Sequence, residues 1–410
     1  MPTSSSPFPS RRADFPEFSG AAYLCVLAML NHMALTGGRI TVSLTALKLG
    51  LSTLQVGTLV AVFAVLPMLA SVHAGRWIDK IGVLRPLVIG TTLTSIGTLL
   101  PFVSQTQAAL TVASCAIGIG FMLHQVATQD LLGHAEPAQR LRNFSWMSLA
   151  LAGSGFCGPL VAGLAIDHLG TRLAFGLLAL GPLASAAGLY LMRVPLARVN
   201  RALTAGHGQP RSGPSPRVAE LLRVPALRRV LLVNTFLSGA WDTHLFVVPV
   251  YGVHIGLSAT TIGVILAAFA AATFIIRLLL PVIQRRVRSW TMVRAAMATA
   301  ATDFMVYPFF EDVGTLIGLS FVLGLALGAC QPSMLALLHQ HSPPGRAAEA
   351  VGLRMALINA SQVSLPLTFG ALGALIGVAP LFWAYALALT VGGWTNRHPP
   401  QESADPPPSS

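Results

Sequence analysis

Charged side chains inside long apolar runs are the residues best able to do chemistry in this sequence. Arg39 lies in NHMALTGGRITVSL, directly after two glycines, and Asp242 lies in SGAWDTHLF. A charge at the centre of a membrane helix costs about 2.5–3.5 kcal/mol on insertion scales, so such residues point to function. The guanidinium of Arg39 could attract an anionic group, and the carboxylate of Asp242 could take up a proton or a cationic group.

The two charges are expected at similar depth. The tripeptide Gly-Leu-Ser occurs at 50–52 and again at 256–258; Arg39 lies 11 residues before the first copy and Asp242 lies 14 before the second. The difference of three residues is about 4.5 Å of helix rise. Two interpretations stay open: a buried ion pair that neutralises both charges, or a site that binds solute and proton. They are compatible if solute or proton breaks the pair during a cycle.

Four residues beside these charges are further candidates. Asn31 and His32 lie two turns before the arginine, Trp241 directly precedes the aspartate, and His244 follows it by two positions. Imidazole can titrate near neutral pH, although a lone histidine in a membrane helix is more often a packing residue. The indole of Trp241 could shelter an organic ring or simply pack.

The remaining polar residues in apolar runs are weaker candidates. Gln125 and Gln331 could each offer an amide to a solute, or could make an interhelical hydrogen bond. Arg277 and Arg354 lie near the ends of their runs, so we interpret them as snorkelling or gate residues rather than as ligands. Two more amides in the last third of the chain could line a cavity, Asn359 and Gln362.

The composition defines the elements that must position these residues. Of the 410 residues, 54% are hydrophobic and 10% are charged, and the mean hydropathy is +0.68. Soluble domains carry about 25% charged residues, and disordered chains have few apolar side chains, so both classes are excluded. The chain is predicted to be an all-α polytopic membrane protein. About twelve apolar runs are long enough to span a bilayer: 19–46, 54–74, 86–104, 107–129, 144–166, 172–192, 228–252, 260–281, 290–309, 313–337, 349–369 and 372–394.

The placement of basic residues predicts orientation. The formal net charge is +12, and only Lys48 and Lys80 among the 26 basic residues are not arginine. Every second joint between runs is rich in arginine, whereas the others hold little more than Lys48 and Arg172, and one is acidic, at 311–312. This positive-inside pattern predicts a multi-pass protein of the inner (plasma) membrane with both termini in the cytoplasm. It also accounts for the basic charge without nucleic acid as a partner.

The chain divides into two halves. Residues 193–227 are basic and rich in Gly, Pro and Ser, which is typical of a cytoplasmic linker, with a short surface helix near its end. The predicted segments are a disordered cytoplasmic N-terminus (1–18), a six-helix bundle (19–192), the linker (193–227), a second six-helix bundle (228–394) and a disordered cytoplasmic C-terminus (395–410).

An offset of 206 residues aligns the two halves. The Gly-Leu-Ser copies, with Gly57 and Gly263 after them, are 206 residues apart. The same offset relates further residues of types that rarely coincide by chance: Gly118 to Gly324, Gln125 to Gln331, Pro137 to Pro343, and Arg140 to Arg346. Two parallel six-helix repeats are the layout of transporters that rock two bundles about a central site.

The joint after the second run carries the clearest motif, GRWIDKIGVLRP. Its residues Gly75, Asp79, Lys80, Gly82 and Arg85 resemble the signature loop between helices two and three of the major facilitator superfamily (MFS). This resemblance implies an MFS-type fold, about twelve transmembrane helices in two six-helix pseudo-symmetric bundles, and a monomer. The equivalent stretch of the second half, 281–290, keeps two arginines but lacks the aspartate and both glycines.

The signature loop is interpreted as a gate. Its glycines allow a tight turn between helix ends, and Asp79, beside Lys80 and Arg85, could pair with a neighbouring helix end and lock one side shut. A loop that only sets topology would explain the positive charges but not the aspartate or the glycines.

The fifth run resembles antiporter branches of the superfamily. Its residues Gly158, Pro159 and Gly163 match a glycine-proline motif, which favours export. Ala162 departs from that motif, and Ser114 stands where drug–proton antiporters carry an arginine, so the antiport interpretation is weakened.

The predicted function is secondary active transport of a small organic solute by alternating access, coupled to protons, with export slightly favoured. The alternative is proton-coupled uptake of an organic anion, which Arg39 favours. The chain has no GxxxxGK[ST] loop for ATP and no HExxH, GxSxG or paired catalytic carboxylates, so neither an ATPase nor a membrane-embedded lipid-modifying enzyme is expected. No cofactor or metal is expected either, because the four cysteines lie in apolar runs without a CxxC pair. A membrane sensor would need a larger soluble output domain than the linker and tails provide.

Overall fold

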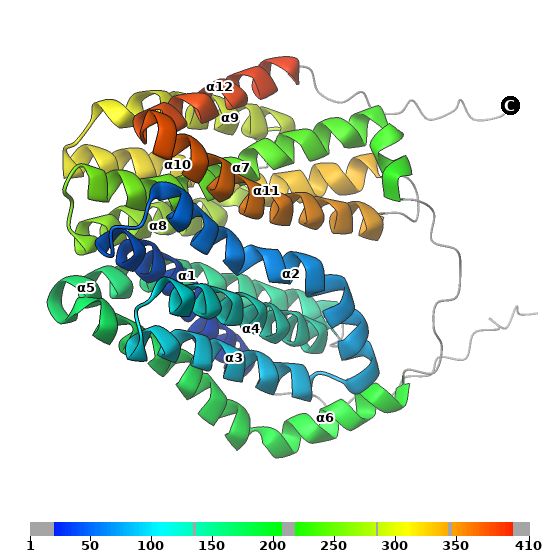
Figure 1. Ribbon diagram of the computed structural model, residues 1–410. Coiled ribbons are helices and arrows are strands. Elements are labelled where there is room, and N and C mark those ends of the chain that lie inside the picture. The colour runs from blue at the N-terminus through cyan, green and yellow to red at the C-terminus, as the bar shows by residue number, and fades with distance from the viewer. Residues whose placement is uncertain (1–19, 134–136, 207–217, 284–285, 343–346, 397–410) are drawn as a thin grey trace, which may run out of the picture.

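The computed structural model describes residues 20–133, 137–206, 218–283, 286–342 and 347–396; in this part of the chain the helices are joined by turns and there is no strand (Figure 1). The helices are α1 (Ala21–Lys48), α2 (Thr53–Ile81), α3 (Leu84–Val103), α4 (Gln107–Gly133), α5 (Pro137–Leu191), α6 (Arg193–Gly206), η1 (Val218–Arg223), α7 (Pro225–His254), α8 (Ala259–Ile283), α9 (Ser289–Val306), η2 (Tyr307–Phe309), α10 (Val313–His341), α11 (Ala347–Ile376) and α12 (Ala379–Thr395). The prediction of an all-α protein is confirmed.

Each predicted apolar run has a helix in the structure. Within the described residues, eight helices are long and apolar enough to cross a membrane: α1, α2, α3, α4, α5, α8, α10 and α11. Helix α5 is two helices in one, because Gly170 has a non-helical backbone (φ 83°) that separates the runs predicted at 144–166 and 172–192. Helix α6 is additional and lies at the start of the predicted linker.

The last predicted joint, between 369 and 372, is wrong. Helix α11 continues to Ile376, the chain turns at Gly377 (φ 84°), and α12 begins at Ala379 with Pro380 in its first turn. Gly370 and Gly373 lie inside α11, where they face Thr53 of α2. These glycines therefore allow close packing of α11 on α2. The residues before and after the actual end of α11 are apolar, so their composition did not mark where the helix ends.

Helix direction alternates, so the turns fall at two ends of the molecule. The turns at Gly50, Gly170, Gly256 and Gly377 all have positive φ and share one end, here called the glycine-turn end. The turn at Gly82 and helix α6 lie at the other end, here called the linker end. Figure 1 shows the connections α7–α8 and α9–α10 at the side opposite α6.

The sequence repeat is also a structural repeat. Gly118 of α4 packs on the backbone of α2, where an added Cβ would lie 2.2 Å from the Phe63 carbonyl oxygen. Gly324 of α10 packs on α8 in the same way, 2.3 Å from the Phe269 carbonyl oxygen. Phe63 and Phe269 are themselves 206 residues apart. Small residues at such crossings let membrane helices approach closely, where packing rather than apolar burial drives association.

We expect Gly324→Ala to destabilise the second bundle by about 1–3 kcal/mol, the usual cost of overpacking, because the clash is with rigid backbone. Gly318→Ala is the matched control, since it lies on the same helix with nothing within 4 Å of an added Cβ. Thermal unfolding of the detergent-solubilised proteins measures both. Equal melting temperatures for the two variants would show that the α8–α10 crossing is not close-packed.

The two halves meet through a pseudo-symmetric pair of crossings, α2 against α11 and α5 against α8. An added Cβ at Gly57 would lie 2.2 Å from the Pro366 carbonyl oxygen, and one at Gly263 would lie 2.6 Å from the Pro159 carbonyl oxygen. Gly163, the last residue of the fifth-run motif, packs on Ala259 of α8. The remaining motif residue, Gly158, packs on Thr36 and Gly37 of α1. The whole motif therefore lies at helix crossings.

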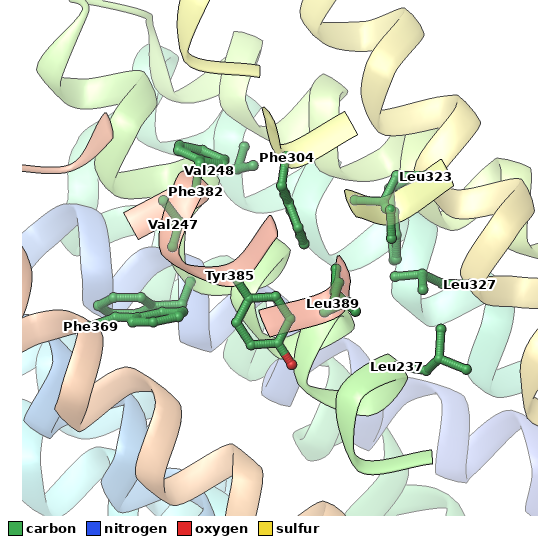
Figure 2. Close-up of a cluster of buried hydrophobic side chains, with 14 of the residues drawn as sticks. Leu237, Val247, Val248, Phe304, Leu323, Leu327, Phe369, Phe382, Tyr385 and Leu389 are labelled. Atoms are coloured by element: carbon green, nitrogen blue, oxygen red, sulfur yellow. The ribbon is translucent and has the colours of Figure 1, made fainter. Parts of the chain in front are cut away.

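Buried aromatic and aliphatic side chains hold the second bundle together. Figure 2 shows Leu237, Val247 and Val248 of α7 packed with Phe304, Leu323, Leu327, Phe369, Phe382, Tyr385 and Leu389. The hydroxyl of Tyr385 donates a hydrogen bond to the Phe236 carbonyl oxygen (2.9 Å). This contact fixes α12 against the segment of α7 that leads to Asp242.

The signature loop sits at the linker end. Gly75, Asp79 and Lys80 lie in the last turns of α2, Gly82 ends that helix (φ 80°), and Arg85 is exposed in the first turn of α3. The side chains of Asp79 and Lys80 lie outside the described part of the structure, so their gating role stays a prediction. The same holds for the predicted disorder of both tails and for the repeat partners Pro343 and Arg346, which lie outside the described residues.

The linker begins with a helix that the sequence analysis did not predict. Asn200 of α6 reaches back to the turn after α2, where its side-chain oxygen accepts a hydrogen bond from the Leu84 backbone N–H (3.1 Å). A Cβ at Gly82 would lie 2.1 Å from that oxygen. The linker helix is thus held directly against the signature loop. Near the linker's other end, η1 buries Leu221 ahead of α7.

Candidate functional site

A cavity of about 590 Å³ lies between the two halves. Seven helices line it, α1, α2, α4, α5, α7, α8 and α11, each with residues spaced three or four apart. This spacing places the lining residues of each helix on one face. The volume is in the range of sites for small organic molecules, about 300–1,000 Å³.

The structure brings Arg39 and Asp242 to this one cavity. Arg39 lies nine residues before the end of α1 and Asp242 lies twelve before the end of α7. At 1.5 Å per residue these positions are about 13 Å and about 18 Å from the glycine-turn end, so the two charges lie at similar depth, as the landmark spacing indicates.

The two charges do not form a direct ion pair in this structure. Asp242 Oδ2 instead accepts a hydrogen bond from the Ser361 hydroxyl of α11 (2.9 Å). Among the described residues, no group hydrogen-bonds Arg39 Nε, which is buried. The Arg39 guanidinium lies 5.7 Å from the centre of the Phe63 ring. The arginine therefore shares the cavity with the carboxylate and keeps hydrogen-bonding capacity for another group.

Three other predicted residues line the same cavity: His32, Gln125 and Trp241. The His32 Nδ1 lies 2.5 Å from the Ser154 hydroxyl, and its ring lies 4.9 Å from that of Phe121. The indole of Trp241 meets the Phe269 ring edge-on, with centroids 4.7 Å apart. A guanidinium, a carboxylate, an imidazole and aromatic walls thus share one chamber.

Three predicted residues do not line this cavity. Asn31 is buried between helices and donates to the Leu27 carbonyl oxygen (3.0 Å) and the Ser185 hydroxyl (2.7 Å). His244 is buried and stacks on Phe269, with centroids 4.5 Å apart. Asn31 is adjacent to His32 and His244 is two positions from Asp242. Such offsets rotate a side chain by about 100° and 200° around a helix, away from the face its neighbour uses.

Gln331 is the third, and it belongs to a buried network instead. Its side-chain oxygen accepts a hydrogen bond from Arg354, whose Nε also donates to the Asn234 side-chain oxygen (2.7 Å). The network joins α10, α11 and α7. Arg354 is 7% exposed, so the prediction that it snorkels or gates is replaced by a structural role, since amide oxygens satisfy its guanidinium.

The interpretation of Arg277 as a snorkelling or gate residue also changes. It lines the cavity four residues beyond Thr273 on the same face of α8. Its Nε is buried, and no partner hydrogen-bonds that atom in the described part of the chain. The expectation of a snorkelling residue followed from its position near the end of an apolar run. A position near the end of a run does not reveal on which face of α8 the side chain lies.

Sequence reasoning also missed polar residues of the site. The cavity wall includes Thr36, Ser43 and Gln129, each three or four residues from a predicted candidate on the same helix. Helical spacing was the signal that could have found them. Asn359 and Gln362 line the cavity as expected.

Asp303 of α9 is a buried acidic residue that was not among the predicted candidates. It is 3% exposed, and neither carboxylate oxygen has a hydrogen-bond partner among the described residues. It lies away from the cavity wall, so it offers a natural comparison with Asp242.

Comparisons with known proteins agree with this architecture. The family model described as Major Facilitator Superfamily matches residues 24–312. A crystal structure of the peptide transporter POT in complex with sulfate is similar, with 16% identity, a TM-score of 0.74, and coverage of 92% of this chain and 94% of that chain. A POT family transporter in complex with 5-aminolevulinic acid is also similar, with 14% identity, a TM-score of 0.73, and coverage of 92% and 95%. At these identities the likeness shows the fold alone. No curated protein sequence matches the chain.

Proposed function

The chain belongs to the Major Facilitator Superfamily, and we propose that it moves a small organic solute across a membrane by alternating access, coupled to protons. The observation that carries this proposal is the presence of Arg39 and Asp242 at similar depth in one cavity between the bundles. Arg39 is the anchor for an anionic part of the solute, and Asp242 is the proton acceptor.

The packing between the bundles supports an alternating cavity. Toward the glycine-turn end, backbone-close crossings at Gly57 and Gly263 bring the halves together. There, the Asp167 carboxylate of α5 also accepts hydrogen bonds from the first backbone N–H groups of α8, at 3.1 Å from Ala259 and 2.6 Å from Thr260. Toward the linker end the cavity wall extends to Gln129 and Arg277. This arrangement fits a state closed at the glycine-turn end.

Proton coupling follows from the charges of the chamber. When Asp242 binds a proton, the Coulomb attraction between its carboxylate and Arg39 is lost, and the guanidinium is left for an anionic group. When the proton leaves, the carboxylate competes again for the arginine and weakens solute binding. One proton and one anionic group therefore favour each other's binding, which is the reciprocal linkage of proton–solute symport and supports the uptake alternative. Export driven by an inward proton gradient would instead need the proton and the solute to compete for the site.

The orientation and direction are part of the proposal. With the arginine-rich joints inside, the linker end faces the cytoplasm of the plasma membrane, and both termini are cytoplasmic. The Gly158-Pro159 motif favours export. Uptake of an organic anion is the alternative, favoured by Arg39. Two of the similar structures hold sulfate and 5-aminolevulinic acid, and both molecules carry anionic groups.

The proposal also covers the oligomeric state, the partners and the cofactors. The protein acts as a monomer in the lipid bilayer, with the solute and protons as its small partners and without nucleic acid or a cofactor. Its family is one of transporters rather than enzymes. The residues described by the structure contain no group of three or more His, Cys, Asp or Glu that could hold a metal ion.

Flux in proteoliposomes tests the proposal. We expect an imposed pH gradient to drive at least one member of a broad panel of organic anions against its concentration gradient, and collapse of the pH gradient by an ionophore to stop it. Opposite pH gradients give the direction. Absence of flux for the whole panel, together with turnover of a lipid, would replace transport by a membrane enzyme.

A further inference from the structure

The cavity contains a second arginine that the proposed function does not use. Arg277 lies on the same α8 face as Phe269, Ala270 and Thr273, all of which line the chamber. Its buried Nε has no hydrogen-bond partner in the described part of the chain. By contrast, the buried Arg354 is satisfied by two amide oxygens. Arg277 therefore has unused hydrogen-bonding capacity that faces a solute-sized space.

The two cavity arginines lie at different depths. Arg277 is 18 residues from the start of α8, about 27 Å from the glycine-turn end, whereas Arg39 is about 13 Å from that end. The two Cα positions are thus about 14 Å apart along the helix axes. Extended arginine side chains that turn toward each other would bring the guanidinium groups closer than this.

The wall between the two arginines is largely apolar and aromatic. Phe121 of α4, Trp241 of α7, and Phe269 and Ala270 of α8 all contribute to it. Such a wall suits an apolar carbon skeleton, whereas a small hydrated inorganic ion would gain nothing from it.

The charges in the chamber also need a counterion. Arg39 and Arg277 contribute two positive charges, and Asp242 is the only acidic residue in the cavity wall as described. Once Asp242 is protonated, both cations lack a counter-charge, and unpaired buried charge is costly. A solute with two anionic groups would satisfy both guanidinium groups at once.

We propose that Arg277 is a second solute-binding residue and that the transported solute is an amphipathic organic dianion, with one anionic group at Arg39 and the other at Arg277. This inference rests on the proposed transport function and names its substrate class.

A series of linear dicarboxylates and chain-matched monocarboxylates tests the inference on the full-length protein in proteoliposomes. Binding is read from fluorescence of Trp241, with a Trp241→Phe variant to assign the signal, and flux is measured separately. We expect wild type to bind the longer dicarboxylates about tenfold or more tightly than the matched monocarboxylates, the scale of one added charge-assisted hydrogen-bonded pair. Short diacids should show less preference, because they cannot reach both arginines.

Arg277→Gln is expected to reduce the dicarboxylate-to-monocarboxylate ratio to about one, and Arg277→Lys to restore part of it, because lysine keeps the charge but not the guanidinium fork. The control is Arg294→Gln, an exposed arginine of α9, which should keep the wild-type ratio. Thermal unfolding without ligand checks that each variant is folded.

The outcomes separate the two proposals. Proton-driven flux of monocarboxylates without any preference for dicarboxylates would overturn the dianion inference and leave the transport function standing. An equal loss of both ligands in Arg277→Gln would also overturn it, since the arginine would then attract anions in general. Dicarboxylate binding without flux in wild type would instead support the site and contradict transport.

Discussion

Asp242→Asn is expected to reduce proton-driven accumulation of the solute by about 100-fold or more, the scale of losing a positioned proton-transfer group. The amide has nearly the same shape and can still accept a hydrogen bond from Ser361, which bonds Asp242 Oδ2 at 2.9 Å. It cannot bind and release a proton. Solute exchange without a gradient needs no proton cycle, so it should fall less than accumulation. Uptake of labelled solute with and without a pH gradient measures both.

The matched control for this prediction is Asp303→Asn. Asp303 and Asp242 are both buried, at 3% and 8% exposure, and both belong to the second bundle. Only Asp242 lines the cavity. We therefore expect Asp303→Asn to accumulate solute like the wild type. Gradient-driven accumulation at the wild-type rate in Asp242→Asn, or equal losses in both variants, would show that Asp242 is not the proton acceptor.

The helices and the repeat could be predicted because their signals are local or periodic. Apolar runs of membrane length and arginine-rich joints are visible in the chain itself. The repeat is visible in glycines that lie 206 residues apart. Gly118 and Gly324 are one such pair, and each lies against the backbone of a neighbouring helix. The end of α11 could not be predicted from the sequence. Gly370 and Gly373 look like helix-terminating residues, but they lie inside α11, which continues to Ile376.

The rotation of each helix about its own axis explains which site residues could be predicted and which could not. Spacing from the Gly-Leu-Ser landmarks gives depth along a helix, and it indicated a similar depth for Arg39 and Asp242. The rotation of the helix decides whether a side chain meets the cavity, and rotation depends on packing with several partners. Arg277 and Arg354 both looked like residues at the ends of runs, yet one faces the chamber and the other is bound by amides.

The crossings suggest how such a site could open to either side. The bundles make close backbone contacts at Gly57 with Pro366 and at Gly263 with Pro159. Contacts of this kind let two rigid bodies rock with few rotamer changes. The buried aromatic and aliphatic cluster of Figure 2 lies within the second bundle, so it would stay intact if the two halves moved as rigid bodies. Arg39 and Asp242, one in each half, would change their separation as the halves move.

Arg39→Gln is expected to weaken solute binding by about 10–100-fold, because hydrogen bonds to a charged group contribute about 1.5–3 kcal/mol. Arg39→Lys should lose less, since it keeps the charge but not the bidentate geometry. Lys48→Gln is the control: it removes an exposed cation from the last turn of the same helix and should bind solute like the wild type. Equilibrium binding of a labelled organic anion measures the three variants.

Stability separates a ligand role for Arg39 from a structural one. No hydrogen bond to Arg39 Nε is present in the described residues, so Arg39→Gln removes no such bond and should unfold thermally near the wild-type temperature when no solute is present. Arg354→Gln breaks bonds to Asn234 and Gln331 and leaves buried amides unpaired, at about 1–3 kcal/mol for each lost partner. It should therefore unfold at a clearly lower temperature. If Arg39→Gln were destabilised as much as Arg354→Gln while it still bound solute normally, Arg39 would be a structural cation and the solute would have to be held elsewhere in the cavity.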